Sequence, residues 1–137
     1  MKAIGIDPDL KRPGFAVWDG ALTVKEIEIT ELIEILGNTD LTDYKIRIEA
    51  GWLNFGNWHI QKAKTKEEAA EIGRRTGENH AAGKILAMLC GAYCNDVELV
   101  RPTTKKLTKA QFKSLTGLDI ASQDARDAGR LILDLRG

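Results

Sequence analysis

The sequence predicts one mixed α/β domain, and three observations lead to this fold class. Short apolar runs that end at turn residues alternate with longer segments that have helical periodicity. The first three apolar runs follow one another through short turns, which predicts antiparallel strands. The last two apolar runs are each preceded by a helical segment, which is typical of parallel strands. The length of 137 residues is that of one ordinary domain, so residues 1–137 are expected to form a single unit.

The strands are predicted from runs of apolar and β-branched residues that are bounded by turn signals. The predicted strands are Lys2–Asp7, Phe15–Trp18, Leu22–Ile29, Lys45–Ala50 and Val97–Val100. Residues 8–14 and the pair Asp19-Gly20 form the turns of the opening meander. Together these segments predict a five-stranded mixed sheet, with three antiparallel strands followed by two parallel ones.

The helices are predicted from apolar periodicity and from capping residues. The predicted helices are Thr30–Leu36, Lys66–Arg75, Asn79–Cys94, Thr108–Leu115 and Ser122–Leu135. Thr65 and Glu68 have the spacing of a capping box at the start of the second helix. The pair Thr76-Gly77 predicts an interruption before the third helix, because glycine is a poor helix former. These helices are expected to flank the sheet.

The composition narrows the classes of function. Lys and Arg together number 20, as do Asp and Glu, so the formal net charge is zero. Any binding to nucleic acid must therefore come from a local basic surface. We expect neither a signal peptide nor a membrane span, because a bilayer span needs roughly 20 consecutive apolar residues. Cys90 and Cys94 are expected to be free, buried thiols, and the protein is expected to be cytoplasmic.

Acidic residues stand at the ends of two predicted strands and as a pair near the C-terminus. Asp7 ends the first strand, and Glu49 closes the apolar run of the fourth. Asp124 and Asp127 are three residues apart, so both side chains project from one helix face. Taken alone, this pair also fits an acidic first turn favoured by the helix dipole. Because strand ends in α/β sheets point at the functional edge, we expect the four carboxylates to share one site.

The chemistry of these ligands favours particular cations. Oxygen ligands without soft partners select Mg²⁺ or Mn²⁺ over zinc or copper. Two such ions about 4 Å apart can hold the attacking water and the leaving oxygen of a phosphodiester in line. The acids therefore predict a metal-dependent nuclease that uses Mg²⁺ or Mn²⁺, with two ions in each active site.

Four sequence motifs resemble those of a known family. Gly5-Ile6-Asp7-Pro8, Gly14-Phe15-Ala16-Val17, Ile48-Glu49 and Asp124-Ala125-Arg126-Asp127-Ala128 are together similar to the RuvC-type Holliday junction resolvases of the ribonuclease-H-like superfamily. The resemblance spans nearly the whole chain and implies a five-stranded mixed sheet flanked by helices. It also implies that Asp7, Glu49, Asp124 and Asp127 are metal-binding catalytic acids. Asp9 departs from the family pattern, in which glycine follows the Asp-Pro pair.

Aromatic residues after Glu49 are expected near the DNA. The family has an aromatic residue three positions after the acid of the fourth strand, and Trp52 has this spacing. The resemblance implies that Trp52 wedges against bases at the junction, while packing in the core or in a loop explains it equally well. Phe55 and Trp58 fit base stacking, a small hydrophobic cap or a dimer contact.

Basic residues gather between the fifth strand and the last helix. The stretch from Arg101 to Gly117 contains five basic residues and no acidic one. This local excess predicts a phosphate-contacting surface, with a solvated helix face as the alternative. Arg74 and Arg75 are expected to extend it. The five basic residues are Arg101, Lys105, Lys106, Lys109 and Lys113.

The resemblance implies a metal-dependent endodeoxyribonuclease that cuts branched DNA such as four-way junctions. In this interpretation Lys106 or Lys109 steadies the scissile phosphate or the charge of the transition state. A homodimer is expected, since a four-way junction needs two symmetric cuts. Two alternatives stay open: a nucleic-acid-binding module that has lost catalytic turnover, and an RNA-directed nuclease of the same superfamily. An actin-like sugar kinase also begins with a strand ending in Gly-x-Asp, but it needs two large domains.

Overall fold

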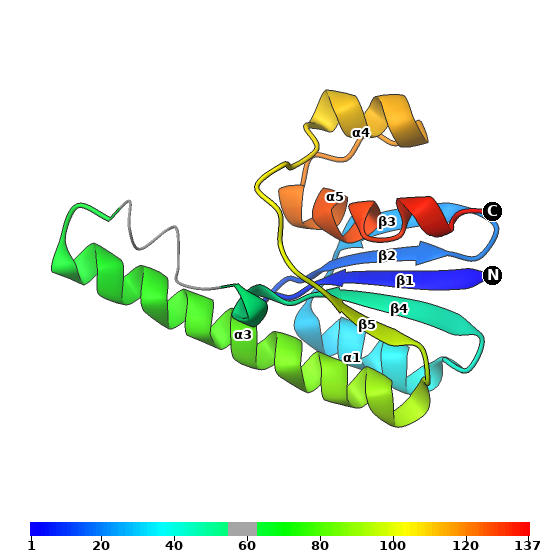
Figure 1. The fold of residues 1–137 in the computed structure, drawn as a ribbon, viewed down its shortest axis with the longest axis horizontal. Helices are drawn as coiled ribbons and strands as arrows, with labels where there is room; N and C mark the ends of the chain where they lie inside the picture. Colours follow the sequence, from blue (N-terminus) through cyan, green and yellow to red (C-terminus); the bar gives the residue numbers. More distant parts are fainter. Residues whose placement is uncertain (55–62) are drawn as a thin grey trace.

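The computed structural model describes residues 1–54 and 63–137, which form a five-stranded mixed sheet with helices on both faces (Figure 1). The strands are β1 (Lys2–Asp7), β2 (Gly14–Trp18), β3 (Leu22–Glu26), β4 (Tyr44–Glu49) and β5 (Val97–Val100), in the spatial order β3-β2-β1-β4-β5. The first three strands are antiparallel, whereas β4 and β5 are parallel to β1. The predicted arrangement of three antiparallel and two parallel strands is confirmed.

The strand register places the two strand acids at one edge of the sheet. Ile6 of β1 is paired with Ile48 of β4 in a parallel ladder. Asp7 and Glu49 each follow these paired residues, so both leave the sheet at the carboxyl ends of neighbouring strands. On the other side of β1, Asp7 is paired with Gly14 of β2. Gly14 thereby comes to lie directly beside one of the acids.

Helices cover the two faces of the sheet. The four helices in the described ranges are α1 (Ile29–Asn38), α3 (Lys66–Tyr93), α4 (Lys109–Thr116) and α5 (Gln123–Arg130). α1 and part of α3 lie on one face, and α5 lies on the other with α4 outside it (Figure 1). Short 3-10 turns, η1 (Gly51–Leu53) and η2 (Leu133–Leu135), follow β4 and α5. Among the described residues, no helix combines the length and apolar character that a bilayer span needs.

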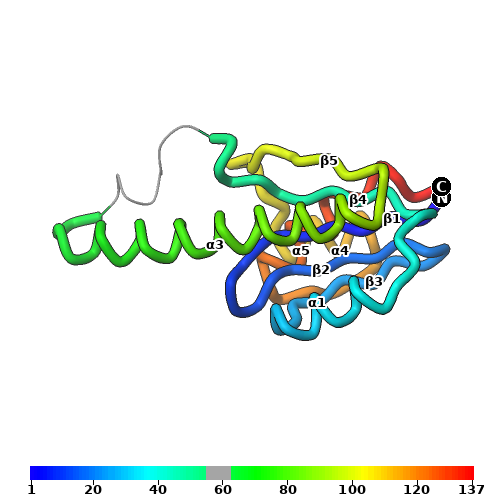
Figure 2. The backbone as a smooth tube through the Cα atoms, turned by 90° about the horizontal axis from the view of Figure 1, so that it is seen from below, coloured from blue at the N-terminus to red at the C-terminus, as the bar shows by residue number. Residues whose placement is uncertain are grey.

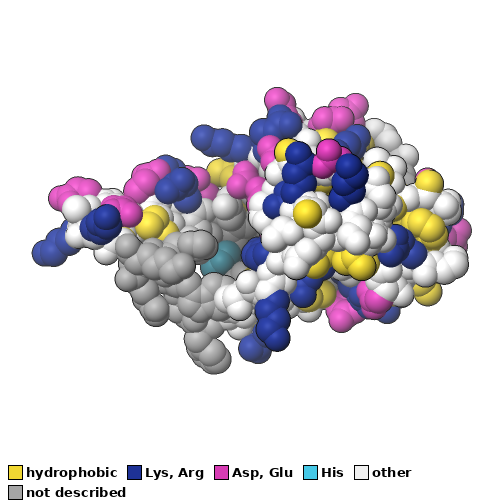
Figure 3. Space-filling view, turned by 90° about the horizontal axis from the view of Figure 1, so that it is seen from above, with side chains coloured by type: hydrophobic (Ala, Val, Ile, Leu, Met, Phe, Trp, Pro, Cys, Tyr) yellow, Lys and Arg dark blue, Asp and Glu magenta, His cyan; other side chains and the backbone are white. Residues whose placement is uncertain are grey.

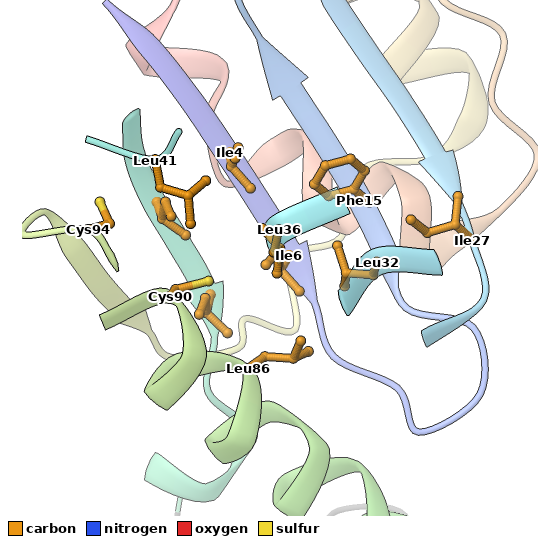
Figure 4. Packing of buried hydrophobic residues seen from close by; sticks show 12 residues of the cluster. Ile4, Ile6, Phe15, Ile27, Leu32, Leu36, Leu41, Leu86, Cys90 and Cys94 are labelled. Carbon is orange, nitrogen blue, oxygen red and sulfur yellow. The ribbon is translucent and has the colours of Figure 1, made fainter. Parts of the chain in front are cut away.

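The alternating residues of β1 and β4 divide the core into two layers. On the α1 and α3 side, large aliphatic side chains fill the space between sheet and helices (Figure 4). This layer includes Ile4, Ile6, Ile46, Ile48, Leu32, Leu36 and Leu86. On the α5 side the layer contains small residues, among them Ala3, Ala16, Ala125 and Ala128. Small side chains let α5 lie close to the strands, which brings its acidic residues near the ends of β1 and β4.

Two glycines allow α5 to pack closely against the sheet. A Cβ atom at Gly5 would overlap the carbonyl oxygen of Ala128, and one at Gly14 would overlap the carbonyl oxygen of Asp124. These neighbours are backbone atoms of a helix, so they have little room to move aside. Glycine is therefore required at both positions for α5 to approach β1 and β2 as closely as it does.

The long helix α3 corrects the prediction of an interruption at Thr76-Gly77, because it continues from Lys66 to Tyr93. Gly77 is exposed, and a helix tolerates one such glycine at a cost of about 1 kcal/mol. Arg74 forms ion pairs with Glu71 and Glu78 across this stretch, which supports the helical turns on either side. The N-terminal part of α3 extends well beyond the sheet (Figure 2).

Two predicted element ends are also corrected. β3 ends at Glu26 rather than at Ile29, because the next residues bond to the turn before β2. The N–H groups of Ile27 and Ile29 donate to the carbonyl oxygens of Pro13 and Lys11. α5 ends at Arg130 rather than at Leu135. The buried Ile132 follows it, and the chain then forms the 3-10 turn η2.

The two cysteines confirm the prediction of free, buried thiols. The Cys94 thiol donates a hydrogen bond to the carbonyl oxygen of Tyr44, with an S···O distance of 3.2 Å. Burial raises the pKa of the Cys90 thiol to about 11. A thiol with so high a pKa is inert at neutral pH, which fits a role in packing.

Candidate metal centre

Three carboxylates from distant parts of the sequence meet at the end of β1. Asp7 ends β1, and Asp124 and Asp127 lie one turn apart in α5. One oxygen of each side chain lies within 4.8 Å of the others. Such a spacing is suited to three ligands of one divalent ion. The structure thus brings together three of the four acids that the sequence predicts as metal ligands.

Local hydrogen bonds fix the start of α5 and therefore the positions of its two acidic side chains. The Ser122 hydroxyl caps the helix by accepting a hydrogen bond from the N–H of Ala125. The same hydroxyl donates to Glu26 of β3, with an O···O distance of 2.6 Å. The cap is thereby tied to the sheet, and Asp124 is held over Gly14.

The fourth predicted acid, Glu49, lies at the same edge of the sheet, and a lysine links it to the other acids. The Lys106 Nζ atom is 2.7 Å from Asp127 Oδ2 and 3.9 Å from Glu49 Oε1. The side chains of Asp127 and Glu49 are only 6% and 14% exposed, whereas that of Lys106 is 41% exposed. Lys106 therefore neutralises these two carboxylates from the solvent side.

Burial and the mutual repulsion of their charges raise the pKa values of three of these carboxyl groups. Burial raises the pKa of Asp7 well above its usual range, and the charges of Glu49, Asp124 and Asp127 add to the shift. Burial is also the largest cause that raises the pKa of Glu49 and of Asp124. Desolvation opposes the charged form of Lys106, but its hydrogen bond to Asp127 and the charge of Glu49 raise its pKa. A bound cation would relieve this repulsion.

A pH-dependent stability follows from the raised pKa of Asp7. The unfolded carboxyl has a pKa of about 3.9, so above that pH the folded state retains a proton that the unfolded chain releases. The free energy of unfolding is therefore expected to fall as the pH rises from about 4 through the raised pKa of Asp7. A Mg²⁺ ion bound by this carboxylate would replace the proton, so Mg²⁺ is expected to raise the melting temperature more at pH 7.5 than at pH 4.

Thermal unfolding of wild-type protein and of Asp7→Asn, each with and without Mg²⁺, checks this expectation. The asparagine variant removes the carboxyl, so the difference between the two pH profiles isolates its contribution. Identical profiles for both proteins, together with a melting temperature that Mg²⁺ leaves unchanged at pH 7.5, would contradict it.

Gln123 and Arg126 also hold the site, although the sequence did not predict a role for either. The Gln123 amide donates to Asp127 Oδ1, with an N···O distance of 2.7 Å. The buried Arg126 guanidinium donates to the carbonyl oxygens of Leu107 and Ile120 and to the side chain of Gln123. Arg126 thus ties α5 to the segment that carries Lys106. A basic residue between two acids of one buried helix face was the signal that could have identified it.

Two hollows border the acids. A cleft of about 420 Å³ lies beside Glu49 and Asp127. Its lining includes Arg47, Arg101, Lys106 and Arg130, and also Glu98 and Asp134. A smaller hollow of about 80 Å³ is lined by Asp7, Glu49, Trp52, Asn79 and His80 among others. The acids therefore separate a large mixed-charge cleft from a small aromatic one.

Trp52 is half-buried beside this smaller hollow. Its ring lies edge-on to His80, with 6.3 Å between the ring centroids. A Cβ atom at Gly83 would meet the Trp52 ring and Pro8, so the indole packs closely on α3. The structure thus gives Trp52 a packing role at the edge of the smaller hollow. Phe55 and Trp58 lie outside the described residues.

The predicted basic surface divides into residues with different partners. Lys106 contacts the acids, and Arg101 lines the large cleft. Lys105 and Lys113 are exposed, and Lys109 is 3.4 Å from Asp119 in an ion pair. In the view onto the α4 side, Lys and Arg side chains gather in groups with acidic side chains between them (Figure 3). Of the two lysines predicted to act at the scissile phosphate, the structure places Lys106 at the acids.

Arg74 and Arg75 differ from the rest of the predicted surface. Arg74 is paired with Glu71 and Glu78, and Arg75 approaches Glu71 at 3.7 Å. Their charge is largely matched by acidic neighbours on α3. The role of these two arginines in DNA contact stays a prediction.

Comparisons with known proteins identify the fold. No protein-family model and no curated protein sequence matches the chain. The chain is similar to the structure of T. thermophilus RuvC in complex with a Holliday junction substrate, at 14% identity and a TM-score of 0.56, covering 97% of this chain and 91% of that one. A second Thermus thermophilus RuvC structure has 14% identity and a TM-score of 0.47, with 98% and 96% covered. The first likeness shows the ribonuclease-H-like fold, as the sequence predicts.

Proposed function

We propose that the protein is a metal-dependent endodeoxyribonuclease that hydrolyses phosphodiester bonds in branched DNA such as four-way junctions. The observation that carries this proposal is the convergence of Asp7, Asp124 and Asp127 at the edge of a ribonuclease-H-like sheet. The fold is shared with a T. thermophilus RuvC whose structure holds a Holliday junction substrate, which supports DNA as the substrate class. The motifs described above add to this support.

The residues fit a hard divalent cation. The donors are carboxylate oxygens, they lie within 4.8 Å of one another, and their negative charges repel without a cation. Asp7, Asp124 and Asp127 would hold one Mg²⁺ or Mn²⁺, and Glu49 with Asp127 would hold a second. When bound, such ions lower the pKa of a coordinated water and stabilise the charge that develops on the phosphate.

The remaining residues position these groups. Gln123 holds one oxygen of Asp127, so the other oxygen keeps its orientation toward Lys106. The Lys106 ammonium lies where it can approach a phosphate oxygen and stabilise negative charge. The burial of Asp127 limits access of bulk water to the acids, which strengthens these electrostatic interactions. Lys109 is proposed as a contributor to phosphate binding at the outer rim.

The large cleft beside Glu49 and Asp127 is the proposed path of a DNA strand. Arg101, Lys105, Lys106, Lys109 and Lys113 would contact phosphates, with Trp52 stacking on a base and Arg74 and Arg75 extending the surface. Arg130 adds positive charge inside the cleft, whereas the charge of Arg47 is matched there by its ion pairs with Glu98 and Asp134. Because the net charge of the chain is zero, this local surface must supply the attraction.

Removal of positive charge from the cleft is expected to weaken DNA binding in a salt-dependent way. Each phosphate interaction that a substitution removes lowers the slope of log affinity against log salt by about 1, so Arg101→Gln with Lys105→Gln should lower it by about 2. Lys25→Gln is the matched control, because Lys25 is exposed on β3, at the sheet edge opposite β5, and an unchanged slope is expected. Fluorescence anisotropy with a labelled four-way junction at several salt concentrations measures both. Equal slopes in all proteins would contradict the proposed surface.

We further propose a homodimer, since two symmetric cuts resolve a four-way junction. Exposed apolar side chains on α3, among them Ile85 and Met88, support an interface with a second copy. The cytoplasmic location predicted from the sequence stays part of this proposal.

A digest of matched substrates tests the proposed function. The protein is incubated with Mg²⁺ or Mn²⁺ and a four-way junction, a linear duplex or an RNA–DNA hybrid. Preferential symmetric cutting of the junction is the expected result. Preferential cutting of the hybrid would favour an RNA-directed nuclease, and binding without cutting would favour a module without turnover.

A further inference from the structure

The Lys106 ammonium lies between the carboxylates of Glu49 and Asp127. Asp7, Asp124 and Asp127 form a first group of oxygens, close enough to one another to share one ion. Glu49 is connected to this group through the Lys106 ammonium, which is 2.7 Å from Asp127 Oδ2 and 3.9 Å from Glu49 Oε1. An ammonium is a compact positive charge, so it serves the same two carboxylates that a second divalent ion would bind.

The backbone around Lys106 is anchored, while its side chain has a route to solvent. The N–H of Lys106 donates to the carbonyl oxygen of Thr104, and the guanidinium of Arg126 holds the carbonyl oxygen of Leu107. These bonds fix the point from which the side chain starts. The side chain itself is 41% exposed, and its four-carbon stem can swing outward without a change of the backbone.

We propose that Lys106 occupies the second cation position of the resting protein and competes with a divalent ion for it. This inference depends on the proposed function, in which the acids bind Mg²⁺ or Mn²⁺. The first ion binds among Asp7, Asp124 and Asp127, and the second binds only when the ammonium leaves Glu49 and Asp127. A phosphate of the substrate is a suitable new partner for the displaced ammonium, so DNA binding would favour entry of the second ion.

Counting bound Mn²⁺ by the electron paramagnetic resonance signal of the free ion tests this proposal. The wild-type protein is expected to bind one Mn²⁺ tightly and a second one much more weakly. In Lys106→Gln the dissociation constant of the second ion should fall roughly ten- to a hundredfold, the equivalent of one charged hydrogen bond. Lys106→Arg keeps the positive charge, so its second ion should stay weak. Lys66→Gln, which removes an exposed lysine at the start of α3, should match the wild type.

The outcomes separate this inference from the proposed function. Two equally tight ions in the wild type, or a second ion that Lys106→Gln leaves unchanged, would overturn the role of Lys106 and leave the metal centre intact. No Mn²⁺ bound at millimolar concentration would overturn both. Addition of Glu49→Gln to Lys106→Gln should abolish the tighter binding of the second ion, since it removes the other ligand. Tight binding of that ion in the double variant would also count against the proposed position.

Discussion

Asp7→Asn is expected to abolish Mg²⁺-dependent cleavage of four-way junctions while the junction still binds. Asp7 is the acid that the other carboxylates surround, and burial and their charges raise its pKa. An amide presents one neutral oxygen in place of a carboxylate, so it would weaken the binding of the divalent ion that, in the proposed function, supplies most of the charge stabilisation. We expect the cleavage rate to fall roughly a thousandfold or more, which corresponds to several kcal/mol of transition-state stabilisation.

Single-turnover cleavage and junction binding measure the two halves of this expectation. Asp19→Asn is a matched control, because Asp19 lies in an exposed turn between β2 and β3. That variant should cleave at the wild-type rate. Full activity of Asp7→Asn would show that catalysis does not depend on the acid cluster, and loss of binding with loss of cleavage would point to a damaged fold.

Gly14→Ala is expected to destabilise the protein and to weaken divalent-ion binding at the same time. The new Cβ would overlap the carbonyl oxygen of Asp124 and press on the N–H of Ala125. Because both atoms belong to the backbone of α5, the helix must shift away from β2. Overpacking of this kind costs typically 1–3 kcal/mol, and we expect about 3 kcal/mol because no side chain can rotate aside. The shift also displaces Asp124 from Asp7.

Gly77→Ala provides the control for this substitution. Gly77 lies in α3 and is exposed, and a Cβ atom there meets nothing within 4 Å. Alanine favours the helix over glycine by about 1 kcal/mol, so this variant should be more stable than the wild type. Urea unfolding and Mn²⁺ titration of both variants measure the effects. Wild-type stability of Gly14→Ala would mean that α5 does not lie on β2 as described.

The sequence carried enough local information to predict the sheet and three of its clustered acids. Strand topology followed from the short turns of the meander and from the helical segments before β4 and β5. Asp7 and Glu49 were predictable as neighbours because parallel strands end at one edge. Asp124 and Asp127 were predictable as a pair from their spacing on one helix face.

Features that depend on long-range packing were not predictable in the same way. The interruption at Gly77 was wrong because a single exposed glycine costs less than the rest of α3 gains. Lys106 and Lys109 could not be separated by sequence, since only the folded loop shows that Lys106 reaches Asp127 and that Lys109 pairs with Asp119. The role of Gly14 likewise depends on the closeness of a helix more than a hundred residues later in the sequence.

Carboxylates from β1 and α5 are proposed to bind a divalent ion together. Anomalous diffraction from a crystal soaked in Mn²⁺ tests this most directly, because the signal locates manganese without reference to activity. We expect a strong peak within coordination distance of Asp7, Asp124 and Asp127, and its loss in Asp7→Asn crystals. Saturating Mn²⁺ that leaves these oxygens without a peak, or a peak that appears only elsewhere on the molecule, would contradict the claim.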